Sequence, residues 1–446
     1  MPLKPNQIRG HVSLAAYILK WSAIVIPVGL VVGSANALFL YLLELVTEFR
    51  LHHVELIFAL PFAGVLIVGL YEWWGQSKRN SAIGHSDQGN NLIMNEIHKP
   101  GGGVPLRMAP LVLLTTVGTH LFGGSAGREG TAIQIGGSLA ELVHIVFRPI
   151  FKLSAEDKRT ILMAGVAAGF GGVFGVPMAG AIFAIEVLAI GRMSYESFFP
   201  CMLASIIADY ACRAWGIHHT AYQVASLVGG AEVAVPYFDW LLMLKTVIAA
   251  ACFGMAGALF AGVTHRLSKL FKLVRWPLVR PMIGGLVLLG FAYVLGTTDY
   301  MGLGTHTLDE NGVSILSAFH AGGADGWSWL WKLLFTAITL SAGFKGGEVT
   351  PLFFIGATLG NTLAWVLGAP VDLFAAMGLI AVFAGATNTP IACTIMGIEL
   401  FGPTHVAYLA LACCVAYYFS GHRGIYTAQR VHTPKPAAAE LAKAGH

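Results

Sequence analysis

The chain contains the stretch GVAAGFGGVFGVPMAGAIFAIEVLAIG at residues 165–191, and a similar stretch, GLIAVFAGATNTPIACTIMGIELFG, at residues 378–402. The two stretches align at Pro177 and Pro390. Both are apolar and rich in small residues, which allow helices in a membrane to approach closely. The proline inside each favours the start of a further helix at that point. The pattern predicts one unit of broken apolar helices that is present twice.

The repeat extends to both sides of the prolines. Glu186 aligns with Glu399, each directly after an isoleucine, and GREGT at residues 127–131 aligns with GGEVT at residues 346–350. Two copies of a glycine-rich entry, an apolar helix and a proline-led helix are typical of transporters built from structural repeats. The sequence alone leaves open whether the second copy is inverted relative to the first.

The composition places the chain in a lipid bilayer. Of its 446 residues, 56% are hydrophobic and only 11% are charged, whereas a soluble globular protein carries roughly a quarter charged residues. So few charges cannot cover a water-facing surface, and several apolar runs approach the roughly 20 residues that a bilayer crossing needs. We therefore predict an all-α polytopic membrane protein. The apolar runs are residues 21–46, 56–74, 240–263, 281–295 and 374–384.

A polar stretch at residues 218–239 is the best boundary between the two copies. On this division, residues 1–217 form the first membrane half and residues 240–432 the second. Residues 433–446 then form a cytoplasmic tail.

The first candidate ion site is GGSAGREGT at residues 123–131. Glycines before a helix leave backbone N–H groups unshielded, and the helix dipole adds positive potential there, so Gly127, Arg128 and Gly130 are candidate anion-binding residues. The Glu129 carboxylate can accept hydrogen bonds from those N–H groups itself. Once Glu129 is protonated, the N–H groups become available to an anion. The alternative is an ordinary first-turn glutamate. Ionisable residues inside membranes are costly and usually functional, which favours the first interpretation.

The second candidate is GGEVTP at residues 346–351. Glycines again precede a helix start, with proline in the first turn, where its missing N–H costs nothing. Glu348 is a second buried carboxylate candidate, and Val349 and Thr350 are candidate anion-binding residues. Thr350 can either cap this helix or offer its hydroxyl to an ion.

Two further candidates are weaker when taken alone. Asn90, in Gly-Asn-Asn at residues 89–91, offers amide donors to a small anion, although an Asn-rich turn is the simpler interpretation. Tyr426 follows a glycine-rich break and can hydrogen-bond an anion, but tyrosine is also common at membrane interfaces. GGGVP at residues 101–105 competes with Asn90 for the same role, and we interpret it as a loop.

Other functional classes find little support. No phosphate-binding loop points to ATP-driven pumping, and no HExxH or clustered ligand spacing points to a metal. The six cysteines lie in apolar surroundings, and a net charge of +4 does not suggest nucleic-acid binding. We interpret His52–His53 and His218–His219 as solvated loop pairs. We therefore expect no enzyme activity, no cofactor and no metal; a non-transporting membrane scaffold and an intramembrane enzyme are the rivals from other classes.

Taken together, these pieces resemble the CLC family of chloride channels and proton-coupled antiporters. GREGT resembles the family's G-R-E-G-P motif, whose glutamate (here Glu129) is the external gate and proton carrier. GEVTP is similar to G-x-F-x-P, and Tyr426 matches the family's late anion-binding tyrosine. Residues 89–91 stand where the G-S-G of the family's G-S-G-I-P would be. The resemblance implies an inverted-repeat fold with broken helices meeting at a central anion site, and a homodimer.

The departures resemble the fluoride/proton antiporter branch, CLC-F. Thr131 replaces the motif proline, Glu348 opens a polar triplet, and Asn90 replaces the serine. Val187 stands where chloride antiporters carry an internal glutamate, which suits a channel. The resemblance implies export of fluoride from the cytoplasm in exchange for protons, with chloride carried weakly, in a bacterial inner membrane. The alternative is a chloride/proton antiporter or passive chloride channel of the same fold.

Overall fold

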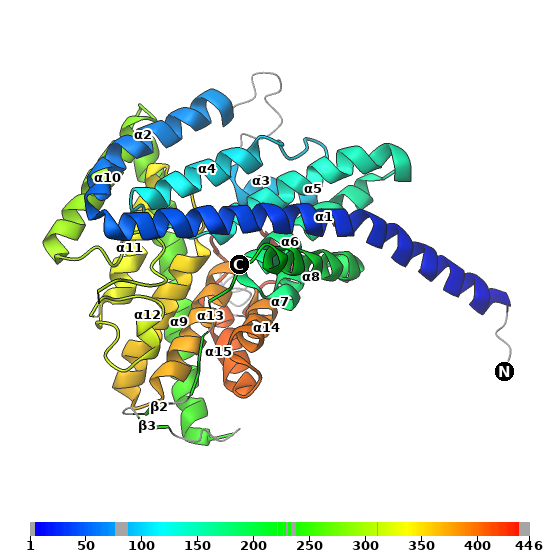
Figure 1. Ribbon diagram of the computed structural model, residues 1–446. Helices are drawn as coiled ribbons and strands as arrows, with labels where there is room; N and C mark the ends of the chain where they lie inside the picture. Colours follow the sequence, from blue (N-terminus) through cyan, green and yellow to red (C-terminus); the bar gives the residue numbers. More distant parts are fainter. Residues whose placement is uncertain are drawn as a thin grey trace, which may run out of the picture.

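The computed structural model describes residues 5–75, 88–220, 222–225, 227–228, 231–232, 238–309 and 311–436. In this part the chain is mostly helical (Figure 1). The helices are α1 (Pro5–His52), α2 (Leu60–Leu70), α3 (Asn90–His98), α4 (Met108–Leu121), α5 (Glu129–Phe151), α6 (Ala155–Phe174), α7 (Pro177–Glu186), α8 (Phe198–Ala214), α9 (Trp240–Leu273), α10 (Val279–Leu295), α11 (Ser328–Ala342), α12 (Val349–Leu367), α13 (Val371–Thr387), α14 (Pro390–Phe401) and α15 (Val406–Phe419). Two-residue strands pair as β1 (Ala189–Ile190) with β4 (Arg430–Val431) and as β2 (Leu227–Val228) with β3 (Ala231–Glu232).

The helices confirm an integral membrane protein. Five helical segments are long and apolar enough to cross a bilayer: Leu14–His52, Val54–Trp74, Glu129–Phe151, Trp240–Leu273 and Val349–Leu367. Six other apolar helices in the described part of the chain have only 10–17 residues, as the glycine and proline pattern predicts. The 10 residues of α7 span about 15 Å, roughly half of a bilayer's hydrocarbon core.

The same local chemistry breaks the helices in both copies of the repeat. Helix α6 ends at Gly175 (φ 73°) and α13 ends at Asn388 (φ 58°), both in the left-handed conformation. Glycine and asparagine are the residue types that adopt this conformation most readily at a helix end. Pro177 and Pro390 then start α7 and α14. The sequence alignment pairs these positions correctly.

The structure also shows that the two copies are inverted. Glu186, at the end of α7, accepts hydrogen bonds from the amides of Ile391 and Ala392 at 3.1 and 2.8 Å. Glu399, near the end of α14, accepts hydrogen bonds from the two residues after Pro177 at 2.9 and 2.8 Å. Each carboxylate therefore caps the start of the other helix. Such an exchange requires α7 and α14 to run antiparallel, as an inverted pair does.

Close glycine contacts hold the long helices of each half together. A Cβ atom added at Gly136 in α5 would lie 2.1 Å from the carbonyl oxygen of Gly165 in α6. A Cβ atom at Gly356 in α12 would lie 2.1 Å from the carbonyl oxygen of Gly378 in α13. Only glycine allows these backbones to approach so closely. The packing of α12 against α13 therefore repeats that of α5 against α6.

Candidate ion-binding site

The two glycine-rich entries meet in the middle of the molecule. Gly127 and Gly347 exchange backbone hydrogen bonds, with N···O distances of 2.6 and 2.7 Å. This antiparallel bridge holds the N-termini of α5 and α12 against each other. Two helix starts, each with a positive partial charge, therefore converge on one point.

Glu129 lies at this point and is fully buried. Its Oε2 atom accepts hydrogen bonds from the amides of Thr350 at 3.0 Å and Arg128 at 3.1 Å. Its Oε1 atom accepts a hydrogen bond from the Thr350 hydroxyl. The carboxylate of α5 is thus seated on the start of α12, where its oxygens take the place of a bound anion. This contact between repeats goes beyond that of an ordinary first-turn glutamate.

Thr350 does not cap its own helix. The N-cap of α12 is Glu348, and no side-chain capping bond forms there. The Thr350 hydroxyl instead donates to Glu129, which rules out capping, one of the two interpretations that the sequence left open. Val349, the first residue of α12, is fully buried beside it.

Asn90 and Glu348 approach the same place from other elements. Asn90 is the first residue of α3 and is buried, and its Oδ1 atom has no hydrogen-bond partner among the described residues. A Cβ atom at Gly130 would lie 3.2 Å from Asn90 Nδ2 and 3.5 Å from Glu348 Oε2. Because Gly130 has no side chain, the Asn90 amide and the Glu348 carboxylate can both approach its backbone.

Tyr426 lines a small cavity together with Asn90. Only 5% of Tyr426 is exposed, and its hydroxyl has no hydrogen-bond partner in the described part of the chain. A cavity of about 10 Å³ is lined by Tyr426, Asn90 and Val187, which is close to the minimum that one water molecule needs. Such burial contradicts an interfacial anchor. Val187 contributes only an apolar surface to this cavity.

Thr131 links α5 to α4 through its side chain. Its hydroxyl lies 2.8 Å from the hydroxyl of Thr116 in α4, and both residues are fully buried. A proline at this position lacks that hydroxyl. The departure from the GREGP pattern therefore brings a hydrogen bond between α4 and α5.

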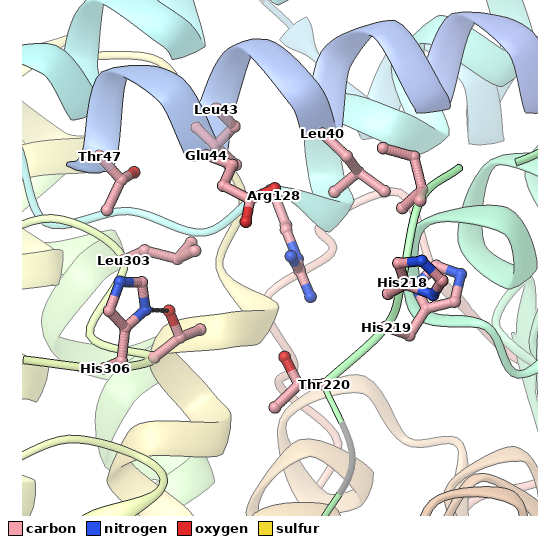
Figure 2. A pocket seen from close by; sticks show the side chains of 12 residues that line it. Leu40, Leu43, Glu44, Thr47, Arg128, His218, His219, Thr220, Leu303 and His306 are labelled. Atoms are coloured by element: carbon pink, nitrogen blue, oxygen red, sulfur yellow. Dashed lines mark hydrogen bonds between the residues drawn. The ribbon is translucent and has the colours of Figure 1, made fainter. Parts of the chain in front are cut away.

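Arg128 faces a different space. Its side chain lines a separate cavity of about 140 Å³ together with residues of α1 and two loops (Figure 2). Arg128 therefore lies between two spaces: its amide donates to Glu129 in the buried cluster, while its side chain lines this second cavity. His219 lines this cavity too, with only 12% of its side chain exposed. The interpretation of His219 as a solvated loop residue is wrong, because the fold packs this loop against α8.

Two polar residues that hydrogen-bond backbone carbonyl oxygens were not singled out in the sequence. Lys332 in α11 is fully buried and donates to the carbonyl oxygens of Tyr300 and Gly302 at 3.2 and 2.9 Å. Gln429 donates to the carbonyl oxygens of Val187 and Thr387 at 2.9 and 2.8 Å. The signal for Lys332 was a lone charge inside an apolar run. Gln429 gave no such signal.

The GGGVP stretch forms a loop between α3 and α4, as predicted. Its Gly101 and Gly102 amides donate to the Glu96 carboxylate at 2.8 and 3.0 Å. Lys158 in α6 also donates to Glu96, at 2.7 Å. This loop therefore anchors the far end of α3, whose first residue is Asn90.

Two helix N-termini that converge on a buried carboxylate are typical of a membrane protein that transports anions. The chain belongs to the voltage gated chloride channel family, whose profile matches residues 64–421. It is 46% identical to the "Chloride/fluoride channel protein" of Pseudomonas syringae pv. tomato over 445 residues, which cover 98% of this chain and 92% of the relative.

Solved structures place it in the same family. A CLC-type fluoride/proton antiporter has 33% sequence identity and a TM-score of 0.83, covering 93% of this chain and 98% of the other. A slow cyanobacterial Cl⁻/H⁺ antiporter, at 19% identity and a TM-score of 0.71, covers 95% of this chain and 98% of the other. That second likeness concerns the fold alone. The family assignment and the all-α inverted-repeat fold are thus confirmed.

Proposed function

We propose that this protein is a proton-coupled antiporter that exports fluoride from the cytoplasm in exchange for protons. One observation carries the proposal: the Glu129 carboxylate accepts hydrogen bonds from the Thr350 amide and hydroxyl, which are donors that a small anion needs. The fluoride/proton antiporter that this chain resembles supports the choice of ions.

The geometry suggests how anion and proton movement are linked. A charged carboxylate and a free anion compete for the same donors, and both cannot hold them at once. Protonation removes the negative charge of Glu129, so that the donors become available to the anion. An anion that leaves lets Glu129 return as a carboxylate. Exchange in opposite directions follows when Glu129 takes up its proton from the outside.

The donors around Glu129 suit fluoride. Fluoride is small and holds water tightly, so its site must offer hard, well-aligned donors in place of the lost water. We assign this role to the Asn90 amide, the Thr350 hydroxyl and the amides of residues 127–130 and 349–350, with Tyr426 at the inner end. Glu348, close to Gly130, is the extra carboxylate on the proton route.

A chloride/proton antiporter or a passive chloride channel is the second candidate. Val187, which lines the cavity next to Tyr426, favours the channel, because chloride antiporters of this family carry an internal glutamate at that position. The relative from Pseudomonas syringae pv. tomato, described as a chloride/fluoride channel, points the same way.

We also propose a homodimer in a bacterial inner membrane. Helices α7 and α14 have 10 and 12 residues, so each spans less than about 20 Å of a core about 30 Å thick. Met178 and Ile391, near their starts, are each 48% exposed. A second copy covers these short helices better than lipid does. Within each copy we retain residues 218–239 as the link between halves and 433–446 as a cytoplasmic tail, both of which lie partly outside the described residues.

The experiment is reconstitution into liposomes, with fluoride and chloride efflux measured while proton uptake is recorded. We expect fluoride efflux to exceed chloride efflux and to be accompanied by proton uptake. Fluoride movement without proton uptake contradicts an antiporter, and a preference for chloride supports the second candidate.

A further inference from the structure

The cavity next to Arg128 has the size and lining of an ion site of its own. Its volume of about 140 Å³ has room for several water molecules. Its polar lining comes from four separate segments and faces one space (Figure 2). The polar lining residues are Glu44 and Thr47 of α1, Arg128, His218, His219 and Thr220 before β2, and Thr305 and His306.

Arg128 links this cavity to the buried site. Its guanidinium projects into the open middle of the cavity (Figure 2). Its Nε atom has no hydrogen-bond partner among the described residues, and the Glu129 Oε1 atom lies 3.5 Å away. An ion that leaves Glu129's donors on this side therefore meets a fixed positive charge next.

Two histidines complete the lining. A Cβ atom at Gly175 would lie 2.4 Å from the His219 ring, so this ring occupies space that glycine leaves open. The His219 Nε2 atom lies 3.6 Å from Asp209 in α8. The His306 ring is held through Nδ1, 3.1 Å from the Thr305 hydroxyl. Both rings are thus held at the wall of the cavity.

The charge pattern places this cavity on the outer side. Cytoplasmic loops carry an excess of Lys and Arg. Residues 215–239 and 297–327, which supply the histidines, contain neither. The end of α9, the turn after it and the start of α10 instead carry five such residues within 264–280, and Lys4, Arg9 and Lys20 precede or begin the apolar part of α1. Since the cavity lies near the far end of α1, it opens away from the cytoplasm.

We propose that this cavity is an outer binding site for a small monovalent anion, held by Arg128 and strengthened when His219 and His306 are protonated. The identity of the anion as fluoride rests on the proposed function. Imidazole is the side chain whose charge changes between about pH 5 and pH 8. An acidic exterior, which supplies protons to Glu129, therefore also strengthens the site that receives the departing anion.

The other charged groups around the rings set the limits of this effect. Glu44 is exposed at the rim and opposes an anion. Asp209 faces His219 but is shared with Arg213 at 2.9 Å, which leaves part of the His219 charge for the cavity. His218 and His306 are both exposed, so solvent screens their charges more than that of His219.

Nuclear magnetic resonance of labelled histidines in the full chain tests the proposal directly. An anion that binds more tightly to protonated rings must, by linkage, make those rings harder to deprotonate. We expect sodium fluoride, compared with sodium gluconate at equal ionic strength, to raise the midpoints of His219 and His306 by about half a pH unit. His53, an exposed residue paired with Glu55 at 3.2 Å outside the cavity, should not shift. Unchanged midpoints of both cavity histidines overturn the proposal.

An Arg128→Gln variant tests whether the anion that shifts the histidines is held by Arg128. If fluoride in the cavity causes the shifts, removing the permanent charge abolishes most of them. Shifts that persist unchanged show that the anion acts from elsewhere, which also overturns the proposal.

Transport gives a second readout. Fluoride export from liposomes is measured with the outer side at about pH 7.5 and about pH 5.5, where imidazole changes charge, at a constant proton gradient. We expect a rise of roughly fivefold in the parent, because each exposed charge pair contributes up to about that factor. The double variant His219→Gln, His306→Asn should lose the rise, and His53→Gln should keep it. An equal rise in the double variant refutes the proposal, whereas a parent without proton coupling refutes only the proposed antiport.

Discussion

Glu129 has two features that proton-coupled anion movement requires in one side chain. It is ionisable, and it accepts hydrogen bonds from Thr350 on the opposite repeat, which are donors that an anion also needs. Glu129→Gln retains the shape but cannot exchange a proton. We expect this variant to lose proton-coupled fluoride transport, measured as uphill fluoride efflux driven by a proton gradient.

Glu156→Gln is the matched control, because Glu156 is exposed in the first turn of α6. Glu44 is unsuitable as this control, because it lines the outer cavity. Uphill efflux that survives in Glu129→Gln shows that the proton is carried elsewhere.

Asn90 presents an amide to the space beside Gly130. Serine is shorter and offers one hydroxyl donor in place of two amide hydrogens. Asn90→Ser should therefore raise chloride flux relative to fluoride flux. The neighbouring Asn91 serves as the control, since its Oδ1 atom accepts the Ala428 amide at 2.9 Å and Asn91→Ser should leave the ratio unchanged. An unaltered ratio in an active Asn90→Ser variant moves the selectivity to Thr350 or Glu348.

Tyr426 combines a buried ring with a hydroxyl that has no partner among the described residues. Tyr426→Phe therefore removes no hydrogen bond that the described chain supplies, and the thermal midpoint in detergent should not fall. A lost hydrogen bond to an ion costs on the order of 1.5–3 kcal/mol, so fluoride affinity should weaken by about tenfold or more. Unchanged affinity assigns the residue to packing alone. Tyr426→Ala, which also removes the ring, should loosen the proton-to-fluoride ratio.

At the scale of elements, glycine positions determine how closely the helices of each half pack. Gly378→Ala places a methyl group 2.0 Å from the Gly356 carbonyl oxygen, which forces α12 and α13 apart. Overpacking of this kind costs about 1–3 kcal/mol or more. We expect a lower thermal midpoint and less folded protein on size-exclusion chromatography.

Gly262→Ala is the counterpart, because a Cβ atom in that part of α9 meets nothing within 4 Å. Alanine is better than glycine inside a helix by about 1 kcal/mol, so this variant should be as stable as the parent or more so. Equal stability of the two variants contradicts the tight crossing of α12 and α13.

At the scale of the whole molecule, the short helices α7 and α14 lead to a prediction about assembly. In lipid nanodiscs the particle mass should correspond to two chains. Ile391→Trp, on the exposed face of α14, should favour the single chain. Leu286→Trp, at a residue of α10 that is 59% exposed, should leave two chains. A single chain in the parent particles contradicts the dimer.

The sequence by itself determined the membrane class, the duplication and the glycine-rich helix starts. These properties depend on composition and on local backbone preferences, such as proline at the first turn and glycine or asparagine at a helix end. The loop at residues 101–105 was also predicted in this way, whereas Asn90, for which a turn was the simpler interpretation, is the first residue of α3.

Only the tertiary structure decided which of these groups meet. Glu129 and Thr350 are far apart in the sequence, and their contact depends on the inverted arrangement of the two halves, which no local pattern encodes. The same holds for the helix caps of Glu186 and Glu399, and for Arg128, which shares a motif with Glu129 but faces the outer cavity. Side chains of adjacent residues at a helix start point in different directions, so only the packing of distant segments decides which space each one enters.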